Sequence, residues 1–395
     1  MGYFMIVPVT LCALAEELKS TGVHPMSVKI FENRSEIKLL KVYDVRVPAA
    51  NILKQEMLSS GGDCAIHKDC ITGKVESGDI LLLGTVRNYE ELLRKLKPMK
   101  FFGLPQIAAK LKNYLQMVHP VTLLADNRVL SYERMRVMGI INLTSDSFYE
   151  KSRHENTKDA LATAERMLEE GADIIDIGAE STRPGAVPVT EEQELIRLLP
   201  VVEEIKKRFP SSIVSVDTYK SAVAQAAIEC GADIINDITG ASNPAISDLA
   251  VKKNVPIIVM HMQGIPRVMQ ENPRYENIIK ELLLFFQARL TTLQKKGLGS
   301  EKLIIDPGIG FGKNFEHNLT LIKRISEFTA FGVPYLLAAS RKTCIGQALG
   351  GLSQEERLAG TIALSCQAVV AGAQIIRVHD VKENVHAIRM MEAMR

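Results

Sequence analysis

The segment from Asp173 to Ala186 joins an apolar run to a group of side chains that can bind an anion. Ile174 to Ile177, bounded by glycines, is typical of a short buried strand. The residues after it follow neither a helical nor a strand period and contain a Pro-Gly pair, so they are predicted to form a loop. In this loop Arg183 stands beside Ser181 and Thr182. Guanidinium and hydroxyl donors placed together suit phosphate-type oxygens.

The same arrangement recurs along the chain, where short apolar runs end in polar or charged residues. Any one of these residues could be a structural group with satisfied hydrogen bonds. Converging on one surface, they would instead form a small-molecule site. The positions are Asn142, Ser181 to Arg183, Asp217, Asn236 with Asp237, His261, Asp306, Ser340 to Lys342, and Arg377 with His379.

Two kinds of chemistry are represented in this set. Carboxylate and amide groups, at Asp217, Asn236 and Asp306, suit a planar heterocycle, because a carboxylate accepts two adjacent N–H groups as a fork. Positive charge suits a phosphorylated substrate. It can come from Arg183, Arg341, Lys342, Arg377 and His379. A nucleophilic mechanism is not indicated, since no serine or cysteine is visibly coupled to a base.

The elements that must position these residues alternate between strands and helices from Arg136 onward. Eight βα units in about 260 residues match a (β/α)8 barrel, whose functional face is the carboxyl end of its strands. An open doubly wound sheet is the alternative, but no glycine-rich dinucleotide fingerprint follows the first strand. The predicted strands are 137–141, 173–177, 213–216, 233–235, 256–260, 303–305, 335–338 and 374–378. Predicted helices are 158–170, 191–209, 219–230, 275–296, 316–328 and 354–371.

Residues 1–130 are predicted to form a separate small α/β domain, and residues 131–395 the barrel. Helices are expected over 48–60, 88–96 with Asn88 as N-cap, and 103–117, and strands over 63–67 and 79–84. The region contains no catalytic constellation, so an interaction or stabilising role is favoured. Cys64, His67 and Cys70 lie close in sequence, but a zinc site would need a fourth ligand.

Composition bounds the function further. With 46% hydrophobic and 24% charged residues, the chain is typical of a globular protein with an ample core. A net charge of +2 gives no reason to expect nucleic acid or an anionic membrane as partner. Six cysteines without framework spacing indicate reduced thiols and a cytoplasmic location. The apolar run from Phe4 to Ala15 is too short to span a bilayer.

From about Arg136 to the C-terminus, the sequence resembles the dihydropteroate synthase family. Several motifs occur in the family's order, which makes the resemblance specific. They are Met138-Gly-Ile-Ile-Asn-Leu-Thr-Ser-Asp-Ser-Phe148, Gly178-Ala-Glu-Ser-Thr-Arg-Pro-Gly185, Ser215-Val-Asp-Thr218, Ile235-Asn-Asp-Ile238, Asp306-Pro-Gly-Ile-Gly-Phe-Gly-Lys313, Ser340-Arg-Lys342 and Arg377-Val-His-Asp380. The family condenses 6-hydroxymethyl-7,8-dihydropterin diphosphate with p-aminobenzoate, giving dihydropteroate and pyrophosphate on the route to folate.

The resemblance implies a role for each matching residue. Asn142 would help to hold Mg²⁺ on the diphosphate, and Arg377 with His379 would bind the diphosphate itself. Lys342, Asp306, Arg183 and Asp146 would be the catalytic residues. The pterin would be bound by Asp217, Asn236, Met260, Asp306, Phe311 and Lys342, and the p-aminobenzoate pocket would include Asp146, Phe148, Thr182, Arg183 and Pro184. The resemblance also implies a homodimer acting on small molecules.

The chain departs from the family pattern in two motifs. The first loop has Ser145 where proline is usual and Tyr149-Glu150-Lys151 where Ser-Asp-Gly is common, and Thr343 replaces a frequent serine. Two other functions are compatible with the motifs. A pterin-dependent methyltransferase shares the barrel and the pterin-binding residues but does not need the Ser-Thr-Arg-Pro loop. A non-catalytic pterin-binding homologue is compatible with the altered first loop.

Overall fold

The computed structural model describes all residues except 1–8, 10, 144–152, 181–187, 267 and 395. The chain divides into two units between Val118 and His119. This division precedes the boundary at residue 130 expected from the sequence, because a hairpin of β4 (Val121–Leu123) and β5 (Val129–Ser131) packs with the barrel. Each unit is described separately.

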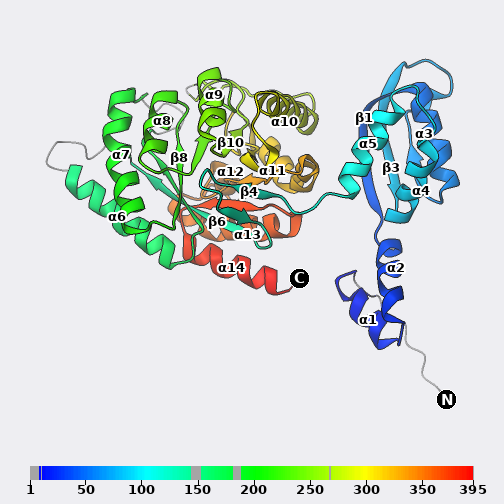
Figure 1. Cartoon of the computed structure of the whole chain (residues 1–395), viewed down its shortest axis with the longest axis horizontal. Helices are drawn as coiled ribbons and strands as arrows, with labels where there is room; N and C mark the ends of the chain where they lie inside the picture. The colour runs from blue at the N-terminus through cyan, green and yellow to red at the C-terminus, as the bar shows by residue number, and fades with distance from the viewer. Residues whose placement is uncertain (1–8, 10, 144–152, 181–187, 267, 395) are drawn as a thin grey trace. The chain divides into compact units, whose positions relative to one another are not determined.

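The first unit is built on a three-stranded antiparallel sheet in the order β1 (Lys38–Arg46), β3 (Ser77–Gly84), β2 (Asp63–Ala65). Three helices pack with it through the apolar core: α3 (Val47–Ser59), α4 (Val86–Leu96) and α5 (Leu104–Leu115). Tyr89 lies in this core and donates its hydroxyl proton toward Lys38 O and Leu82 O, at 2.8 and 3.0 Å. Two further helices, α1 (Leu14–Ser20) and α2 (Pro25–Ser35), precede the sheet (Figure 1).

The small α/β domain expected from the sequence is therefore present, with two differences. The strand β1 was not predicted, although it pairs with β3 along most of its length. The N-cap of α4 is Thr85, so the prediction of Asn88 was wrong. Asn88 is instead the third residue of a capping box. Its Oδ1 accepts the Thr85 N–H at 2.8 Å, while the Thr85 hydroxyl accepts the Asn88 N–H.

The second unit is an eight-stranded parallel barrel, as predicted, with its strands in the predicted order. Neighbouring strands pair in the sheet order β11-β10-β9-β8-β7-β6-β13-β12. The remaining gap is bridged where the Ile305 N–H donates to Pro334 O at 2.9 Å. The strands are β6 (Arg136–Asn142), β7 (Ile174–Gly178), β8 (Ile213–Asp217), β9 (Ile234–Asp237), β10 (Ile257–Met260), β11 (Leu303–Asp306), β12 (Leu336–Leu337) and β13 (Ile375–Val378).

Helices surround the barrel and alternate with its strands (Figure 1). The predicted helix 316–328 ends early, at Lys323, and a 3-10 helix follows from Ile325 to Phe331. Ile325 and Phe328 are both buried three residues apart, which matches the three-residue turn of that helix. The helices are α6 (Arg153–Glu169), α7 (Glu191–Arg208), α8 (Ser221–Glu229), α9 (Pro244–Lys253), α10 (Ile278–Lys295), α11 (Phe315–Lys323), α12 (Thr343–Ala348), α13 (Leu358–Ala371) and α14 (Val381–Ala393).

The barrel interior changes from apolar to polar along the strands. Side chains alternate between the two faces of a strand, so every second residue points inward. The first inward set is apolar and packs against Leu124, Leu130 and Tyr132 near the β4–β5 hairpin, which closes the amino end of the barrel. It includes Met138, Ile174, Ile234, Ile258, Ile304, Leu336 and Ile375. Two residues further on, the inward positions include Asp176, Ser215, Asn236, Met260, Asp306 and Arg377.

Candidate active site

The centre of the polar layer is a buried network around Arg377. Its Nε donates to Asp176 Oδ2 at 2.6 Å, and its Nη2 donates to Asp217 Oδ2 at 2.9 Å. Asp176 also accepts from the Asn236 Nδ2, at 3.3 and 3.4 Å to its two oxygens. Four strands, β7, β8, β9 and β13, thus contribute to one cluster. Of the predicted residues, Asp217, Asn236 and Arg377 are brought together here.

Asp217 has an unusual environment for a carboxylate. Burial raises the pKa of Asp217 to about 7, and the nearby Asp176 charge acts in the same direction, while Arg377 opposes both. A group whose pKa lies this close to neutrality in a cleft is typical of a binding or catalytic site. The Ser215 hydroxyl, on the same strand, is buried without a hydrogen-bond partner. This part of the barrel therefore holds polar groups that its own fold leaves incompletely satisfied.

Asp306 stands at the end of β11 and is only 3% exposed. Its Oδ1 accepts the Gly308 N–H at 2.7 Å, which fixes the carboxylate plane and leaves Oδ2 for another donor. Burial raises the pKa of Asp306 to about 6, whereas the Gly308 hydrogen bond and Lys342 lower it. Gly308 has φ +68°, and a Cβ there would lie 2.1 Å from the His261 carbonyl oxygen, so only glycine fits this turn.

Lys342 reaches the same region from the loop after β12. Its Nζ lies 4.3 Å from the centre of the Phe311 ring, which places a cation over an aromatic face. Gly310 lies against the lysine stem, since a Cβ there would come within 3.3 Å of Lys342 Cδ. Burial and the Arg377 charge lower the pKa of Lys342 to about 8. The loop after β11 thus shapes the surroundings of Lys342 as well as those of Asp306.

His379 is neutral rather than a source of positive charge. Burial and the Arg377 and Arg341 charges lower the pKa of His379 to about 4. Its Nδ1 lies 2.9 Å from the Ser340 hydroxyl, which also accepts the His379 N–H at 3.2 Å. If the hydroxyl accepts the backbone N–H, its own proton points to Nδ1, and the ring proton is on Nε2. Arg341, also expected to supply charge, is paired with Asp380.

Two other predicted polar residues have structural partners. Asp237 accepts hydrogen bonds from Thr239 and Ala241, within a turn after β9. His261 faces the Lys313 ammonium, at 3.0 Å from its Nδ1, and Lys313 also donates to the carbonyl oxygens of His261 and Phe311. Lys313 therefore fastens the loop after β11 to the end of β10.

The remaining predicted residues fall into two groups. Met260 is buried at the end of β10, Phe311 is half-buried beside Lys342, and Asn142 is exposed at the end of β6. The others lie outside the described residues, so their predicted roles stay predictions. These are Asp146, Phe148, Thr182, Arg183 and Pro184.

An ion cluster that the sequence did not indicate fixes Glu180, which lies just after β7. Lys220 Nζ contacts Glu180 Oε2 and lies 2.5 Å from Glu194 Oε2, and the Tyr219 hydroxyl donates to Glu180 Oε1 at 3.1 Å. Glu194 is 1% exposed, and Lys220 is its ion-pair partner. Through it, the segment that precedes residue 181 is tied to α7 and to the loop after β8.

For a metal ion, the candidate ligand at the mouth that the family resemblance implies is the Asn142 amide, at the end of β6. Within the described residues, no group of three or more His, Cys, Asp or Glu side chains could hold an ion, and this includes the surroundings of Cys64 and Cys70. Mg²⁺ usually binds few protein ligands and completes its shell with substrate phosphates and water. An Asn142 amide that shares the ion with substrate phosphates would fit this pattern.

Comparisons with known proteins match the barrel and its motifs. Residues 138–379 match the model of the pterin binding enzyme family. Dihydropteroate synthase of Escherichia coli K12 is 45% identical over 271 residues, which are 69% of this chain and 95% of that protein. The chain belongs to the dihydropteroate synthase family.

A solved family structure shows the same barrel. The crystal structure of Yersinia pestis dihydropteroate synthase in complex with a sulfonamide drug superposes with a TM-score of 0.64 at 44% identity. It covers 68% of this chain and 97% of that one. A longer relative, the bifunctional dihydropteroate synthase/dihydropteroate reductase of Helicobacter pylori, is 36% identical over 384 residues, 97% of either chain. The dihydropteroate synthase barrel is thus matched by short relatives, and the first unit by a long one.

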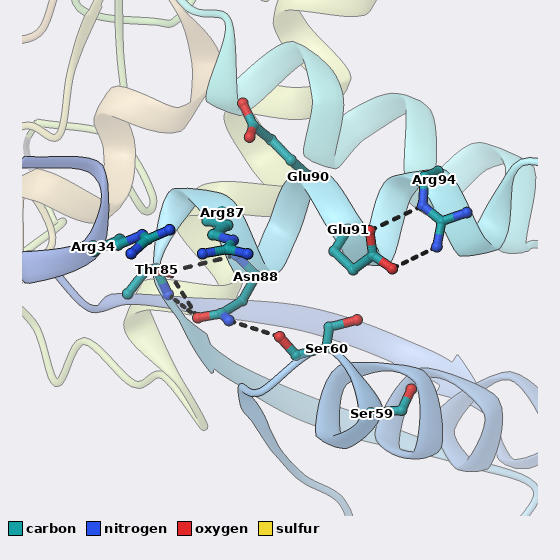
Figure 2. A pocket seen from close by; sticks show the side chains of 9 residues that line it. All are labelled: Arg34, Ser59, Ser60, Thr85, Arg87, Asn88, Glu90, Glu91 and Arg94. Carbon is teal, nitrogen blue, oxygen red and sulfur yellow. Dashed lines mark hydrogen bonds and ion pairs between the residues drawn. The ribbon is translucent and has the colours of Figure 1, made fainter. Parts of the chain in front are cut away.

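Beyond the barrel, the first unit has an open hollow of about 590 Å³ at the start of α4 (Figure 2). Most of its polar groups bond one another. Asn88 Nδ2 donates to Ser60 O at 2.7 Å, and Arg94 forms two hydrogen bonds with Glu91. Arg34 and Arg87 line it as exposed side chains. In contrast to the barrel mouth, the hollow contains no buried acid or base.

Sequence reasoning missed three functional-site residues, namely Asp176, Lys220 and Asp380. Asp176 lies inside a predicted strand, where it was counted as part of an apolar run. A usable signal was present, because Asp176 is two residues after the inward-facing Ile174 and so shares its face. No local pattern marks Lys220, and Asp380 ends the motif Arg377-Val-His-Asp380 without any sign of its partner, since the partners of both residues are distant in sequence. In the part of the chain that is described, no helix is both long and apolar enough to cross a membrane.

Proposed function

We propose that the barrel mouth condenses 6-hydroxymethyl-7,8-dihydropterin diphosphate with p-aminobenzoate, with Asp306, Lys342 and the Arg377 network as its binding groups. In this reaction, the methylene C–O bond to the diphosphate breaks and a bond from that carbon to the aniline nitrogen forms. Pyrophosphate leaves with the bonding electron pair, and the aniline nitrogen loses one proton. The observation that carries the proposal is one mouth containing both an acid–amide set and a cationic set, in a chain of this family.

The pterin ring is proposed to lie against Asp306, Asn236 and Asp217. Among the described residues, Asp306 Oδ2 has no hydrogen-bond partner, so it can accept an N–H from the amino-pyrimidinone edge, while Oδ1 retains a second lone pair. Asn236 donates weakly to Asp176, which leaves its amide oxygen available as an acceptor. Met260 and Phe311 are also proposed to contact the pterin. A site built to bind ring N–H groups discriminates strongly against rings that lack them.

The diphosphate is proposed to contact Arg377 and His379. A guanidinium has five N–H donors, and the two bonds to Asp176 and Asp217 leave three of them for phosphate oxygens. His379 offers its Nε2 proton, since Nδ1 faces Ser340. Asn142 would ligate Mg²⁺, which would neutralise charge developing on the leaving pyrophosphate. The two carboxylates hold Arg377 in place before substrate arrives, so its charge is preorganised.

The second substrate is proposed to enter above the pterin. Its pocket would be formed by Asp146, Phe148, Thr182, Arg183 and Pro184, as family resemblance implies, together with the Lys342 ammonium. Two structural features support this placement. Glu180 anchors the chain just before residue 181, and Lys342 lies near enough to Asp306 for its charge to lower the pKa of that carboxyl. The chain is further proposed to be a cytoplasmic homodimer. Its free thiols at Cys64, Cys70, Cys230, Cys344 and Cys366 fit a reducing compartment.

The test is one turnover assay with both substrates and Mg²⁺. We expect dihydropteroate and pyrophosphate to form in equal amounts, with chelation of Mg²⁺ reducing the rate. Methyl transfer from a methylated pterin without pyrophosphate release would show a pterin-dependent methyltransferase instead. Pterin binding by calorimetry without either product would show a non-catalytic homologue. Light scattering at assay concentration distinguishes a dimer from a monomer.

A second candidate activity, reduction of the dihydropteroate product, is favoured by one observation. The bifunctional H. pylori relative aligns over 97% of this chain, so its similarity includes the first unit. Such a reduction adds two electrons and two protons to the pterin ring, supplied by a reduced nicotinamide or flavin donor. Incubating the full chain with dihydropteroate and each donor tests it. Absence of tetrahydropteroate with both donors would limit this chain to the synthase reaction.

A further inference from the structure

The loops after the last two strands of the barrel are joined by a bidentate ion pair. Arg341 Nε donates to Asp380 Oδ2 at 2.8 Å, and its Nη2 donates to Asp380 Oδ1 at 2.6 Å. The side chains are 24% and 18% exposed, so the pair is partly shielded from water. Bidentate pairing in such a setting is stronger and more directional than a surface contact between a lysine and a carboxylate. Neither side chain has a role in the proposed reaction.

The backbone of Arg341 is also held on both sides. Its N–H donates to Thr361 Oγ1 at 3.0 Å, and its carbonyl oxygen accepts from Arg357 Nη1 at 3.0 Å. Arg341 has φ +54°, a left-handed conformation that costs free energy in any residue other than glycine. A non-glycine residue retained in this conformation indicates that its side chain contributes something glycine cannot supply. The Asp380 contact is the evident candidate.

The residues adjacent to this ion pair are those assigned to the substrate. Lys342 directly follows Arg341, and His379 directly precedes Asp380. A second link runs parallel to the first, because Ser340 and His379 share two hydrogen bonds. The two loops are therefore joined at consecutive residues, 340 to 379 and 341 to 380. Movement of either loop would displace Lys342 relative to His379.

We propose that Arg341 and Asp380 are positioning residues that fix Lys342 and His379 relative to each other in the barrel mouth. The inference rests on the proposed roles of Lys342 and His379. Arg341 acts through Asp380 and does not contact the substrate. Displacing a substrate-binding group by about 1 Å can reduce a rate by about 100-fold, which makes such a pair kinetically important without direct contact.

The experiment compares Arg341→Gly, Asp380→Ala and the double variant. Glycine at 341 keeps the left-handed backbone without strain and removes only the guanidinium. Each single variant is expected to lower kcat/KM for the pterin diphosphate by about 10- to 100-fold. The double variant is expected to lose no more kcat/KM than the more impaired of the two single variants, because both changes break the same interaction. Arg341→Lys should not rescue activity, since one ammonium cannot bridge both carboxylate oxygens.

A matched control separates positioning from general destabilisation. Arg128 forms a comparable pair at the amino end of the barrel, with 2.6 Å contacts to Asp126 and Asp233. Arg128→Lys should lower Tm and leave kcat/KM unchanged. The Arg341 and Asp380 variants should instead weaken Mg²⁺-pyrophosphate binding about tenfold by calorimetry at 25 °C, where the protein remains folded, because His379 is displaced.

Two outcomes would overturn the inference. If Asp380→Ala is near wild type while Arg341→Gly is severely impaired, Arg341 contacts the substrate directly. If both variants lose only thermal stability, with turnover and pyrophosphate affinity unchanged, the pair is purely structural. Failure of the proposed reaction is seen separately, as absence of dihydropteroate from the wild-type chain. Pyrophosphate affinity then still reports on the ion pair.

Discussion

The two units differ in what they bury. Among the described residues of the first unit, no carboxyl, amine, imidazole, guanidinium or amide side chain is buried. In the barrel, by contrast, several are, namely Asp176, Glu194, Asn236, Asp237, His261, Lys302, Asp306, Lys313, Asn318 and Asn384. Burying such groups lowers stability unless they are paired, so a fold retains them where partners or ligands compensate. The contrast favours the barrel as the place of the proposed reaction on grounds that are independent of the motifs.

Shifted pKa values show the same difference. In the barrel, burial moves the pKa values of Asp217, Asp306 and Lys342 to between about 6 and 8, close to neutrality. In the first unit, burial raises the pKa of Cys64 to about 11, away from neutrality, and the thiol stays protonated. Burial thus moves the pKa of this thiol out of the range in which it would titrate near neutral pH. The predictions below test whether this contrast separates function from stability.

The largest effect is expected from Asp306→Asn. The amide places an N–H donor where the carboxylate accepted a pterin N–H, so the affinity for a pterin analogue should fall by about 2 to 4 kcal/mol. Mg²⁺-pyrophosphate affinity should change little, because other residues bind it. Titration calorimetry with each ligand measures both, and equal losses would remove Asp306 from the pterin site.

The same substitution should stabilise the free protein. The folded-state pKa of Asp306 is raised, so its ionisation is unfavourable in the fold and lowers stability as pH rises through about 6. Asparagine does not ionise, so Tm at pH 8 should exceed that of wild type, with the difference disappearing near pH 4. A lower Tm at pH 8 would mean that the charge of Asp306 stabilises the barrel.

Lys342→Ala is expected to lower kcat about 100-fold, because a preorganised charge at the reacting groups is lost. The change also removes the cation placed over Phe311. Circular dichroism should show an unchanged fold, and turnover with saturating substrates measures the effect. A rate near that of wild type would exclude Lys342 from the reaction.

A smaller and gradual change in kcat/KM is expected when the pH is varied. The Asp306 and Asp217 carboxyls, with pKa values raised to about 6 and 7, must be ionised, so kcat/KM should rise through this range. Lys342 must be protonated, and its pKa is lowered to about 8, so kcat/KM should fall above that pH. Lys342→Arg should move the alkaline limb upward. An unchanged alkaline limb in that variant would assign it to another group.

The smallest effect is expected in the first unit. Thr85→Ala removes the capping box of α4, which should cost about 1 kcal/mol of local stability. Hydrogen exchange of the α4 amides should accelerate, while kcat/KM for the synthase reaction remains unchanged. A loss of turnover in this variant would break the contrast, because it would connect the first unit to the barrel chemistry.

Much of the barrel could be predicted because its signals are local. Each strand is a short apolar run followed by a polar residue, so Leu303–Asp306 could be recognised from four letters. β1 could not, because Lys41, Asp44 and other charged residues interrupt its apolar positions on a half-exposed sheet. The N-cap of α4 lies three residues earlier than predicted, because Thr85 and Asn88 form a reciprocal capping box and the sequence alone does not show which of them is the cap.

The sequence predicted several of the residues that meet at the barrel mouth, but not how their side chains pair. Strand ends marked Asp217, Asn236, Asp306 and Arg377, since parallel strands bring their carboxyl ends to one edge. That Arg377 is held by Asp176 and Asp217, or Arg341 by Asp380, depends on contacts between residues 39 to 201 positions apart. The neutrality of His379 likewise follows from burial among cations, which no local pattern carries.

The β4–β5 hairpin has a consequence for the order of events. Leu124, Leu130 and Tyr132 close the amino end of the barrel with apolar side chains, and Lys302 donates to Leu124 O at 3.1 Å beneath them. Substrates can therefore enter the barrel only at its carboxyl end. A molecule bound deep in the barrel must bind before the molecule that covers it, and it can leave only after that second molecule has left. A compound that binds at the deep position therefore prevents binding of every later molecule. Binding of a compound at the outer position alone depends on which molecule already occupies the deep position.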